Sequence, residues 1–255
     1  MTESAQPNTV DAESAVRLET VSVVVPTYRE RENVVQLVEA VERVRETRLP
    51  NLDLWIMDDK SNDGSAEAVA AMGRGWVHFI EREGTRGLSA AVLDGLNASA
   101  GDLCVVMDAD LSHDPGYIPA MLDALDAGAD FVVASRYVRG GSTDAGWGVF
   151  RWLNSRVATL LSRPLASLRD PMSGFFALRR STLERGAEFN PIGYKIGLEL
   201  IVKTGSRVVA EIPIHFADRT RGTSKLSLRE QLRFIEHLRR LYIFRFLSRA
   251  PRPDR

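Results

Sequence analysis

The sequence predicts an α/β protein built on a doubly wound, mostly parallel sheet with helices on both faces. Two observations carry this prediction. Short apolar runs of strand character alternate with amphipathic segments of helical spacing from residue 21 to residue 135, and polar residues follow the ends of three of these runs. Strands separated by helices connect as right-handed βαβ units, so the strands of such a sheet lie parallel.

The elements of this first part follow in a regular order. Expected strands are runs rich in apolar, β-branched and aromatic residues, namely Val21–Val25, Leu52–Met57, Trp76–Ile80, Leu103–Met107 and Phe131–Ala134. Expected helices between them are Glu30–Glu46, Ser65–Met72, Leu88–Ala98 and Tyr117–Leu125. In the first helix, apolar residues at helical spacing predict a buried face of Val34, Leu37, Val38, Val41 and Val44.

The pattern changes after residue 135. A glycine-rich loop leads into a helix expected near Phe150–Leu161, and Gly174–Leu178 and Arg207–Phe216 are expected as further strands. Residues 226–247 predict a long helix with arginines beside an apolar stripe of Leu228, Leu232, Ile235, Leu238, Tyr242 and Phe246. We therefore expect a disordered lead over residues 1–20, one domain over 21–225, an amphipathic helix over 226–247 and a basic tail over 248–255.

Composition and charge limit the classes of function. The chain has 255 residues, of which 44% are hydrophobic and 26% charged, as in soluble globular proteins. The net charge of −1 gives no reason to propose nucleic acid as a partner. The charge is uneven, because residues 225–255 hold nine Lys or Arg and three Asp or Glu, a balance of +6 that leaves −7 elsewhere. A basic end on an acidic body favours an anionic surface or partner.

Cysteine content and hydropathy bear on the compartment. Cys104 is the only cysteine, so no intrachain disulfide can form, which fits a reducing compartment. Its place in an apolar strand predicts a buried, unreactive thiol. Residues 1–20 contain no apolar signal segment, and no stretch approaches the roughly 20 apolar residues that span a bilayer. We expect a cytoplasmic protein that reaches a membrane, if at all, from its surface.

The most informative motif is Asp108-Ala109-Asp110, which directly follows the expected strand Leu103–Met107. Ligands of open α/β sheets bind at the carboxyl ends of the strands, where these two carboxylates are expected. Carboxylates are hard oxygen ligands for Mg²⁺ or Mn²⁺, and such an ion can hold a diphosphate. A polar turn without a metal is the simpler interpretation of Asp-x-Asp by itself.

Two other strand ends carry polar residues. The first strand ends in Pro26-Thr27-Tyr28-Arg29-Glu30 without a glycine fingerprint, which argues against a dinucleotide-binding turn and against a P-loop. The second ends in the acidic pair Asp58 and Asp59, which could accept hydrogen bonds from a base or ribose. A polar turn in which Asp63 or Ser65 caps the next helix is the simpler interpretation of that segment by itself. Three such ends on one edge of a sheet together favour a nucleotide site.

These segments resemble glycosyltransferases of family 2, which have the GT-A fold. The motifs are Val-Pro26-Thr-Tyr28-x-Glu30-x-x-Asn33, Asp58-Asp59-x-Ser61-x-Asp63-Gly64 and Asp108-Ala-Asp110-Leu-Ser-His-Asp-Pro115. Three later motifs narrow the resemblance to polyprenyl-phosphate (dolichyl-phosphate) mannose synthases. They are Ser135-Arg136-Tyr137-Val-x-Gly140-Gly141, Asp170-Pro-Met-Ser173-Gly174-Phe-Phe176 and Asp218-Arg219-x-x-Gly222-x-Ser224-Lys225. The resemblance covers about residues 21–245.

The resemblance implies an enzyme that uses a nucleotide sugar, GDP-mannose, together with Mg²⁺ or Mn²⁺. Asp108 and Asp110 match the metal-binding positions, and Ser112 stands where the family often has Gln as a third ligand. A serine hydroxyl is a weaker ligand, and water could replace it. Residues that match positions around the nucleotide sugar are Pro26, Tyr28, Glu30, Asp59, Asp108 and Arg151. Arg29 departs from the common Asn and Lys60 from the common Gly, and both lie near the nucleotide edge.

The implied acceptor is a polyprenyl monophosphate, which explains the arginines. A phosphate monoester is largely dianionic near pH 7, so it needs no general base to attack the sugar. It needs positive charge to approach the donor, and the candidates are Arg136, Arg151, Arg219 and Lys225. Asp110, Arg136, Arg219, Lys225 and Ser173 are the expected catalytic residues, although Ser173 could equally be a turn residue. Direct attack would invert the configuration of the sugar.

Alternatives remain at this stage. The helix over 226–247 could lie on a membrane surface or could simply pack with its arginine stems along the protein. Many relatives carry transmembrane helices after this point, whereas this sequence stops at Arg255, so peripheral binding or a separate membrane-anchoring subunit is expected. The donor could be UDP-glucose, or the acceptor could be a sugar hydroxyl. A different class of function is a non-catalytic subunit that binds a sugar nucleotide.

Overall fold

The computed structural model of the chain describes residues 19–144, 149–193, 195–217 and 228–247, without the side chains of 149–155 and 228–230. The expected lead up to residue 18 and the basic tail over 248–255 lie outside the described residues.

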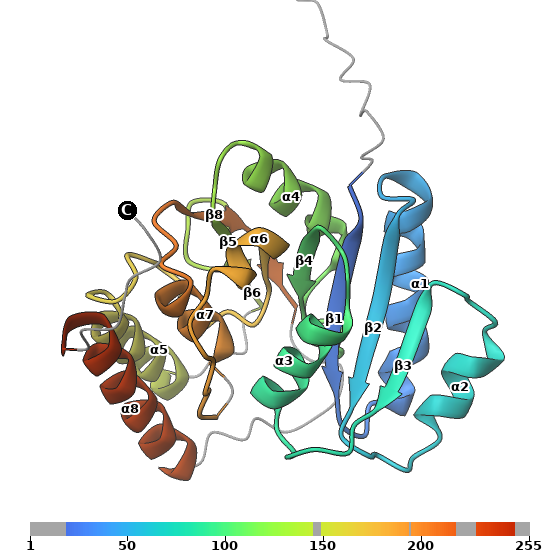
Figure 1. Ribbon diagram of the computed structural model, residues 1–255, viewed down its shortest axis with the longest axis horizontal. Helices are drawn as coiled ribbons and strands as arrows, with labels where there is room; N and C mark the ends of the chain where they lie inside the picture. The colour runs from blue at the N-terminus through green and yellow to red at the C-terminus, as the bar shows by residue number, and fades with distance from the viewer. Residues whose placement is uncertain (1–18, 145–148, 194, 218–227, 248–255) are drawn as a thin grey trace, which may run out of the picture.

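A seven-stranded mixed sheet forms the centre of the molecule (Figure 1). Its order is β3-β2-β1-β4-β7-β5-β8, and β7 runs antiparallel to both neighbours, whereas the other pairs are parallel. The strands are β1 (Val21–Thr27), β2 (Leu52–Asp58), β3 (Val77–Glu81), β4 (Leu103–Val106), β5 (Phe131–Ser135), β7 (Phe176–Arg179) and β8 (Val209–Pro213). The predicted doubly wound, mostly parallel sheet is confirmed.

The direction of winding reverses at β1. The chain passes outward from β1 to β2 and β3 and then returns to β4 on the other side of β1. Register pairs Thr27 with Asp58 and Val24 with Val106, so the carboxyl ends of these strands lie side by side. A crevice for ligands is expected at such a switch point.

Helices cover both faces of the sheet. One apolar cluster joins the sheet to α1 (Arg31–Thr47), α2 (Ser65–Ala71) and α4 (Ile118–Asp126). A second cluster joins the other face to α3 (Leu88–Ala98), α6 (Arg180–Glu184) and α7 (Ile196–Lys203). The predicted buried face of α1 is confirmed, and a 3₁₀ turn, η1 (Pro115–Tyr117), precedes α4. Sequence periodicity does not predict α6 and α7, which are short.

Side-chain size and alternation set the packing of the core. In β1, Val23 and Val25 face the first cluster and Val24 faces the second, as the two-residue period of a strand requires. A Cβ atom added at Gly95 of α3 would collide with Val24 and Met57, so glycine allows α3 to approach the sheet closely. Cys104 is fully buried in β4, and burial raises the pKa of its thiol to about 11, which fits the predicted unreactive role.

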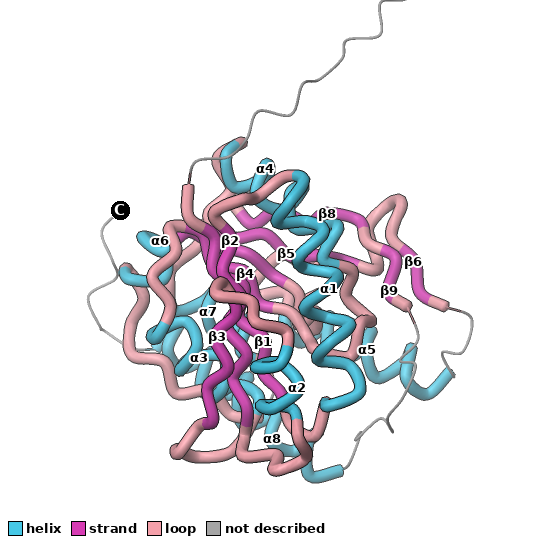
Figure 2. The backbone as a smooth tube through the Cα atoms, turned by 90° about the vertical axis from the view of Figure 1, so that its right-hand side faces the viewer, coloured by secondary structure: helices cyan, strands magenta, loops and turns pink. Residues whose placement is uncertain are grey.

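One predicted strand is wrong in its extent. The segment Arg207–Phe216 forms two strands, β8 in the main sheet and β9 (His215–Phe216), which pairs with β6 (Ser142–Thr143). β8 ends at Pro213 on the edge of the main sheet, a position that proline tolerates because its nitrogen needs no partner strand there. Figure 2 shows β6 and β9 side by side, apart from the main sheet.

The last helix, α8 (Leu228–Tyr242), continues into a π-helical turn, η2 (Ile243–Leu247). Its inner face carries His237, Leu238 and Leu241, each at most 5% exposed. The residues of the predicted stripe differ in exposure: Leu238 is buried, whereas Leu232, Ile235 and Phe246 are 60%, 57% and 58% exposed. Apolar side chains thus occupy two sides of this helix, and only one of them packs against the body.

A buried charged cluster holds α8 against α7. Glu199 Oε2 lies 2.9 Å from His237 Nε2, and its Oε1 accepts from Lys203 Nζ at 2.7 Å and from the Asn190 N–H at 2.6 Å. Burial alone would raise the pKa of Glu199, but the hydrogen bonds from these partners lower it. Glu199 is therefore a buried carboxylate that is stabilised in its charged form.

Candidate active site

The loops that follow β1, β2 and β4 meet at one edge of the sheet. They contain every described non-glycine residue with a positive φ: Arg29 at 61°, Lys60 at 55°, Asn62 at 47° and Leu111 at 60°. Such left-handed conformations cost free energy in residues with a side chain and cluster at functional sites. This edge is therefore the candidate site, as the three polar strand ends predict.

Asp58 organises the loop after β2. It is 1% exposed and accepts hydrogen bonds from Thr27 Oγ1 at 3.1 Å and from the N–H of Ser61 at 2.7 Å. The Ser61 hydroxyl also donates to Asp58, at 2.5 Å, and accepts from the N–H of Arg29 at 2.7 Å. Asp58 thus joins the β1 and β2 loops, and this structural role explains the first aspartate of the acidic pair.

Asp59 is held by a residue that the sequence analysis missed. Arg82, immediately after β3, donates through Nη1 to Asp59 Oδ1, and the N–H of Gly87 donates to Asp59 Oδ2 at 2.8 Å. The same guanidinium donates through Nε to Asp94 at 2.9 Å and through Nη2 to the Thr85 carbonyl at 3.1 Å. The side chain of Arg82 is 3% exposed, so it fixes Asp59 rigidly. Its position directly after the third strand is the signal that could have identified it.

Residues of the β1 loop lie next to this carboxylate loop. Tyr28 is 38% exposed, and the guanidinium carbons of Arg29 and Arg86 lie 5.2 and 5.5 Å from the centre of its ring. Glu30 precedes α1 and accepts from Asn33 Nδ2 at 2.7 Å. Pro26 is half-buried in β1. The predicted nucleotide-binding residues of β1 and β2 therefore share one edge of the sheet.

The Asp108–Asp110 loop follows β4 at the same edge. Asp110 is 8% exposed, and its Oδ1 accepts from the N–H of Ser112 at 3.1 Å and from the Ser112 hydroxyl at 2.5 Å. The side chain of Asp108 is 26% exposed. Ser112 is 1% exposed and supports Asp110 by these hydrogen bonds.

His113 is a second residue that the sequence analysis missed. The backbone N–H of Asp108 donates to His113 Nδ1 at 3.1 Å, so a neutral ring carries its proton on Nε2. The ring packs 5.1 Å from the Phe175 ring and 5.4 Å from the Phe216 ring, measured between centres. Burial lowers the pKa of His113, although the negative charges of Asp108 and Asp110 act to raise it. A neutral histidine therefore holds the backbone of this loop.

Arg136 follows β5 and forms a bidentate ion pair with Asp170. Its Nε and Nη2 donate to the two carboxylate oxygens at 2.7 and 2.8 Å, and its backbone N–H donates at 3.1 Å. Burial alone would lower the pKa of Arg136, but the hydrogen bonds and charge of Asp170 raise it. Asp170 is fully buried, and Glu211 of β8 accepts from its N–H at 2.9 Å.

The antiparallel strand β7 brings this ion pair to the same edge. Because β7 is reversed, Phe176 at its amino end pairs with Val106 at the carboxyl end of β4. The preceding segment, 170–174, therefore lies beside the Asp108 loop. A Cβ atom added at Gly174 would lie 3.4 Å from both carboxylate oxygens of Asp108, and the Ser173 hydroxyl accepts from the Phe175 N–H at 3.2 Å.

Three predicted site residues cannot be placed in this geometry. Arg219 and Lys225 lie outside the described residues, and Arg151 lies in α5 (Val149–Ser162) in the stretch without described side chains. The described residues before Arg219 include β9, which pairs with β6. There the centre of the Phe216 ring lies 5.1 Å from the guanidinium carbon of Arg136. Their roles stay predictions.

The donor set of the site suits Mg²⁺ or Mn²⁺. Within the described ranges, no group of three or more His, Cys, Asp or Glu side chains could hold a metal ion. Asp108 and Asp110 supply two carboxylates, and Mg²⁺ is commonly bound by one or two carboxylates together with phosphate oxygens and water. Gly174 lies beside the Asp108 carboxylate, which a Cβ atom built there would contact at 3.4 Å. The two carboxylates therefore suit a metal ion whose other coordination positions are filled by phosphate oxygens and water.

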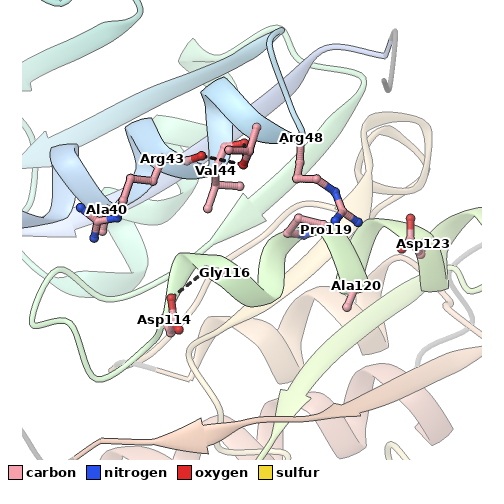
Figure 3. A pocket seen from close by; sticks show the side chains of 10 residues that line it. Ala40, Arg43, Val44, Arg48, Asp114, Gly116, Pro119, Ala120 and Asp123 are labelled. Carbon is pink, nitrogen blue, oxygen red and sulfur yellow. Dashed lines mark hydrogen bonds between the residues drawn. The ribbon is translucent and has the colours of Figure 1, made fainter. Parts of the chain in front are cut away.

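A separate groove of about 440 Å³ lies between α1 and the η1–α4 segment (Figure 3). Arg43 and Arg48 line one side, and Asp114 and Asp123 line the other. Asp114 accepts from the Gly116 N–H at 2.8 Å and thereby caps η1. None of the predicted site residues lines this groove, so we do not assign the chemistry to it.

Comparison with known proteins identifies the family. Residues 22–186 match the model of glycosyl transferase family 2. The chain is 40% identical over 234 residues to a dolichol-phosphate mannosyltransferase of Mycosarcoma maydis, covering 88% of this chain and 80% of the relative. It is 36% identical over 218 residues to the polyprenol monophosphomannose synthase of Mycolicibacterium smegmatis, covering 80% of each. A dolichol-phosphate mannosyltransferase of Pyrococcus furiosus is 38% identical over 226 residues, which are 87% of this chain, and the match spans 63% of that relative.

Solved structures agree with the fold. Glucosyl-3-phosphoglycerate synthase of Mycobacterium tuberculosis, in complex with Mn²⁺, UDP and phosphoglyceric acid, superposes with a TM-score of 0.67 at 21% identity. The match covers 91% of this chain and 80% of that one. The fold is thus of the GT-A type, as the resemblance implies. The chain belongs to glycosyl transferase family 2, and within it to the polyprenyl-phosphate (dolichyl-phosphate) mannose synthase type that its motifs resemble.

Proposed function

We propose that this protein transfers mannose from GDP-mannose to a polyprenyl or dolichyl monophosphate, with inversion at the sugar and with dependence on Mg²⁺ or Mn²⁺. The observation that carries the proposal is the closeness of the 170–174 segment to Asp108. A Cβ atom built at Gly174 would lie 3.4 Å from both carboxylate oxygens of Asp108. It brings the loop that suits a metal-bound diphosphate together with the Arg136–Asp170 pair. The names of the mannosyltransferase relatives support this choice of sugar and acceptor.

On the donor side, the chain's residues bind and orient the nucleotide sugar. Pro26, Tyr28, Glu30 and Asp59 form the wall for base and ribose, and Arg82 holds Asp59 in place. Asp108 and Asp110 hold the metal, which acts as a Lewis acid on the diphosphate leaving group when it is bound. The M. tuberculosis neighbour, which has the same fold, is in complex with Mn²⁺ and UDP, and this supports the choice of a divalent ion.

On the acceptor side, positive charge brings two anions together. Arg219 and Lys225 are proposed to bind the acceptor phosphate directly. Arg136 keeps its charge at the site while its bidentate pair with Asp170 orders the 170–174 segment. Ser173 in that segment is proposed to hydrogen-bond near the reacting centre, and Arg151 is proposed to bind the nucleotide sugar. The phosphate attacks the anomeric carbon from the side opposite the leaving diphosphate, so an α-linked donor gives a β-linked product.

The test is transfer of labelled sugar into lipid. Purified full-length chain is incubated with labelled GDP-mannose, a short polyprenyl phosphate and Mn²⁺ or Mg²⁺, beside a UDP-glucose reaction and an EDTA control. Lipid-soluble label from GDP-mannose that EDTA abolishes, with a β-linkage by NMR, is the expected result. Label from UDP-glucose alone would contradict the sugar, and an α-linked product would contradict the inverting mechanism. Tight GDP binding without any transfer would favour a non-catalytic subunit.

The membrane surface is the proposed location of the acceptor. No described helix is long and apolar enough to cross a bilayer. However, Leu232, Ile235 and Phe246 of α8 are more than half exposed, and Leu160 of α5 is 65% exposed. Tyr242 donates to the carbonyl of Leu161 at 2.8 Å, so α5 and α8 lie together, as Figure 1 shows. Arginines beside exposed apolar residues are typical of helices that lie on anionic membranes.

Flotation with vesicles that contain phosphatidylserine tests this location. Ile235→Asp should reduce the bound fraction by on the order of tenfold, because burial of one isoleucine contributes about 1.5–3 kcal/mol. Val208→Asp is the matched control, since Val208 is also 57% exposed but lies next to β8. Equal flotation of both variants and the wild type would contradict an α8 contact. No flotation of the wild type would favour a separate membrane-anchoring subunit.

A further inference from the structure

The positions of strands in the sheet indicate where the base of a bound nucleotide would lie. The Asp108 loop follows β4, and the sheet continues from β4 through β1 and β2 to β3. Neighbouring strands are about 4.8 Å apart, so β3 lies about 14 Å from β4. A nucleoside diphosphate whose phosphates are at Asp108 and whose base points along this edge therefore places the base near the ends of β2 and β3.

Two arginines stand at that end of the edge. Arg29 follows β1 and Arg86 lies between β3 and α3, and both guanidinium carbons lie within 5.5 Å of the centre of the Tyr28 ring. Both side chains are exposed, and neither has a carboxylate partner among the described residues. A guanidinium that stacks on an aromatic ring uses its flat face, so the N–H donors in its plane stay available. We call these two residues the guanidinium pair.

Asp59 is a fixed hydrogen-bond acceptor at the same edge of the sheet. Asp59 is held by Arg82 and by the N–H of Gly87 at 2.8 Å. Each carboxylate oxygen has two lone pairs, so Asp59 can still accept from a base. The site thus presents an acceptor in a fixed position and a pair of planar donors.

Guanine and uracil differ in how they match this arrangement. Guanine presents two adjacent acceptors, O6 and N7, which a single guanidinium binds with two parallel hydrogen bonds. Guanine also offers N1–H and N2–H donors for a carboxylate. Uracil offers an N3–H donor and single carbonyl acceptors, and it lacks the O6/N7 pair. The bidentate donor is therefore the element that discriminates between the two bases.

We propose that the guanidinium pair, Arg29 and Arg86 around Tyr28, recognises the O6/N7 edge of guanine and selects a guanosine diphosphate sugar over a uridine one. The proposal rests on the proposed function as a nucleotide-sugar transferase and assigns its base specificity to named residues.

Calorimetric titration of the full-length chain with GDP, UDP and 7-deaza-GDP, in the presence of Mg²⁺, tests the proposal. The deaza analogue replaces the N7 acceptor by C–H and changes nothing else on the base edge. We expect wild type to bind GDP about 10- to 100-fold more tightly than UDP, and 7-deaza-GDP more weakly than GDP. Arg86→Lys and Arg29→Lys keep the charge but lose the planar fork, so in at least one of them the GDP preference and the sensitivity to the deaza substitution should fall together.

Controls separate this proposal from its alternatives. Arg43→Lys, on the exposed surface of α1 in the groove of Figure 3, should leave every affinity unchanged. Equal losses of GDP and UDP binding in Arg86→Lys and Arg29→Lys would show phosphate binding and overturn base recognition. Unchanged GDP preference in both variants, or a wild type that prefers UDP, would overturn it while leaving a sugar-nucleotide enzyme. Failure to bind either nucleotide would contradict the proposed function as well.

Discussion

The two halves of the candidate site are held together by different means. The donor half consists of the loops after β1, β2 and β4. Several bonds within single loops hold it, such as Asp110 with Ser112 and Asp58 with Ser61, and the buried Arg82 adds a bond to Asp59. The acceptor half consists of Arg136, the 170–174 segment, Glu211 and Phe216, and a buried ion pair between distant segments holds it. The donor half follows from the order of parallel strands, whereas the acceptor half depends on one reversed strand.

The two halves therefore differ in what the loss of a carboxylate does to them. Loss of the Asp110 carboxylate in the donor half would remove a proposed metal ligand together with two local hydrogen bonds from Ser112. Loss of a carboxylate in the acceptor half leaves a buried arginine without its partner, which is costly for the fold. Substitutions can therefore separate an effect on chemistry from an effect on stability.

The largest expected effect on activity is in the donor half. Asp110→Ala should lower the rate of mannose transfer by about 10²- to 10³-fold, because one of the two carboxylates proposed to hold the metal on the leaving diphosphate is lost. The measurement is label transfer at saturating Mn²⁺, with the unfolding midpoint recorded in parallel. Asp114→Ala is the control, since Asp114 belongs to the same segment but only caps η1. Similar activities of the two variants would contradict the assignment of Asp110.

The second effect is on stability in the acceptor half. Asp170→Asn should lower the free energy of unfolding by about 3–5 kcal/mol, because Arg136 would keep a buried charge with a neutral partner. Urea denaturation followed by circular dichroism measures it. Asp126→Asn, which breaks the exposed pair with Arg179, should cost at most about 1 kcal/mol. A loss for Asp170→Asn no greater than that of the control would show that the buried pair does not stabilise this half.

His113 tests the connection between the halves, because its ring contacts Phe216 while its Nδ1 holds the Asp108 backbone. His113→Leu should weaken Mn²⁺ binding by about 10- to 100-fold, as is typical when support of a metal site is lost. His113→Asn keeps an acceptor near the Nδ1 position and should recover much of that affinity. Titration of Mn²⁺ by electron paramagnetic resonance measures both. Equal affinities for Leu and Asn would contradict the hydrogen-bond role.

The smaller effect on stability concerns the support behind the acceptor half. α7 carries Glu199, and Lys195 just before it donates to the Met172 carbonyl at 3.4 Å. Glu199→Gln should cost about 1.5–3 kcal/mol at neutral pH, since the hydrogen bonds to a charged group weaken. Urea denaturation at a series of pH values measures this difference.

The stabilising contribution of Glu199 should depend on pH, and the direction follows from its pKa. The folded-state pKa of Glu199 lies below its usual value of 4.5, so its contribution is fully present above pH 4.5. As the pH falls from 4.5 through the lowered folded value, the folded state loses this advantage. The difference between wild type and Glu199→Gln should therefore shrink on acidification. A difference that stays constant or grows would contradict a stabilised carboxylate.

The sequence alone determined the first half of the fold and the donor half of the site. Strand and helix patterns from Val21 to Ala134 have a clear period, and each predicted element of this part forms within a few residues of its expected bounds. In a parallel sheet, polar residues at consecutive strand ends must share an edge, so Asp59, Asp108 and Asp110 could be brought together from their positions in the chain.

Only the tertiary structure decided the acceptor half and the supports of the donor half. Nothing in the Gly174–Leu178 pattern shows that β7 is reversed, because an apolar run has the same period in either direction. In the sequence, Arg82, His113 and Glu199 look like ordinary polar residues, and only the structure shows their contacts with Asp59, the Asp108 backbone and His237. Their roles depend on their burial and on the residues that they contact, and both are decided by how the whole chain packs.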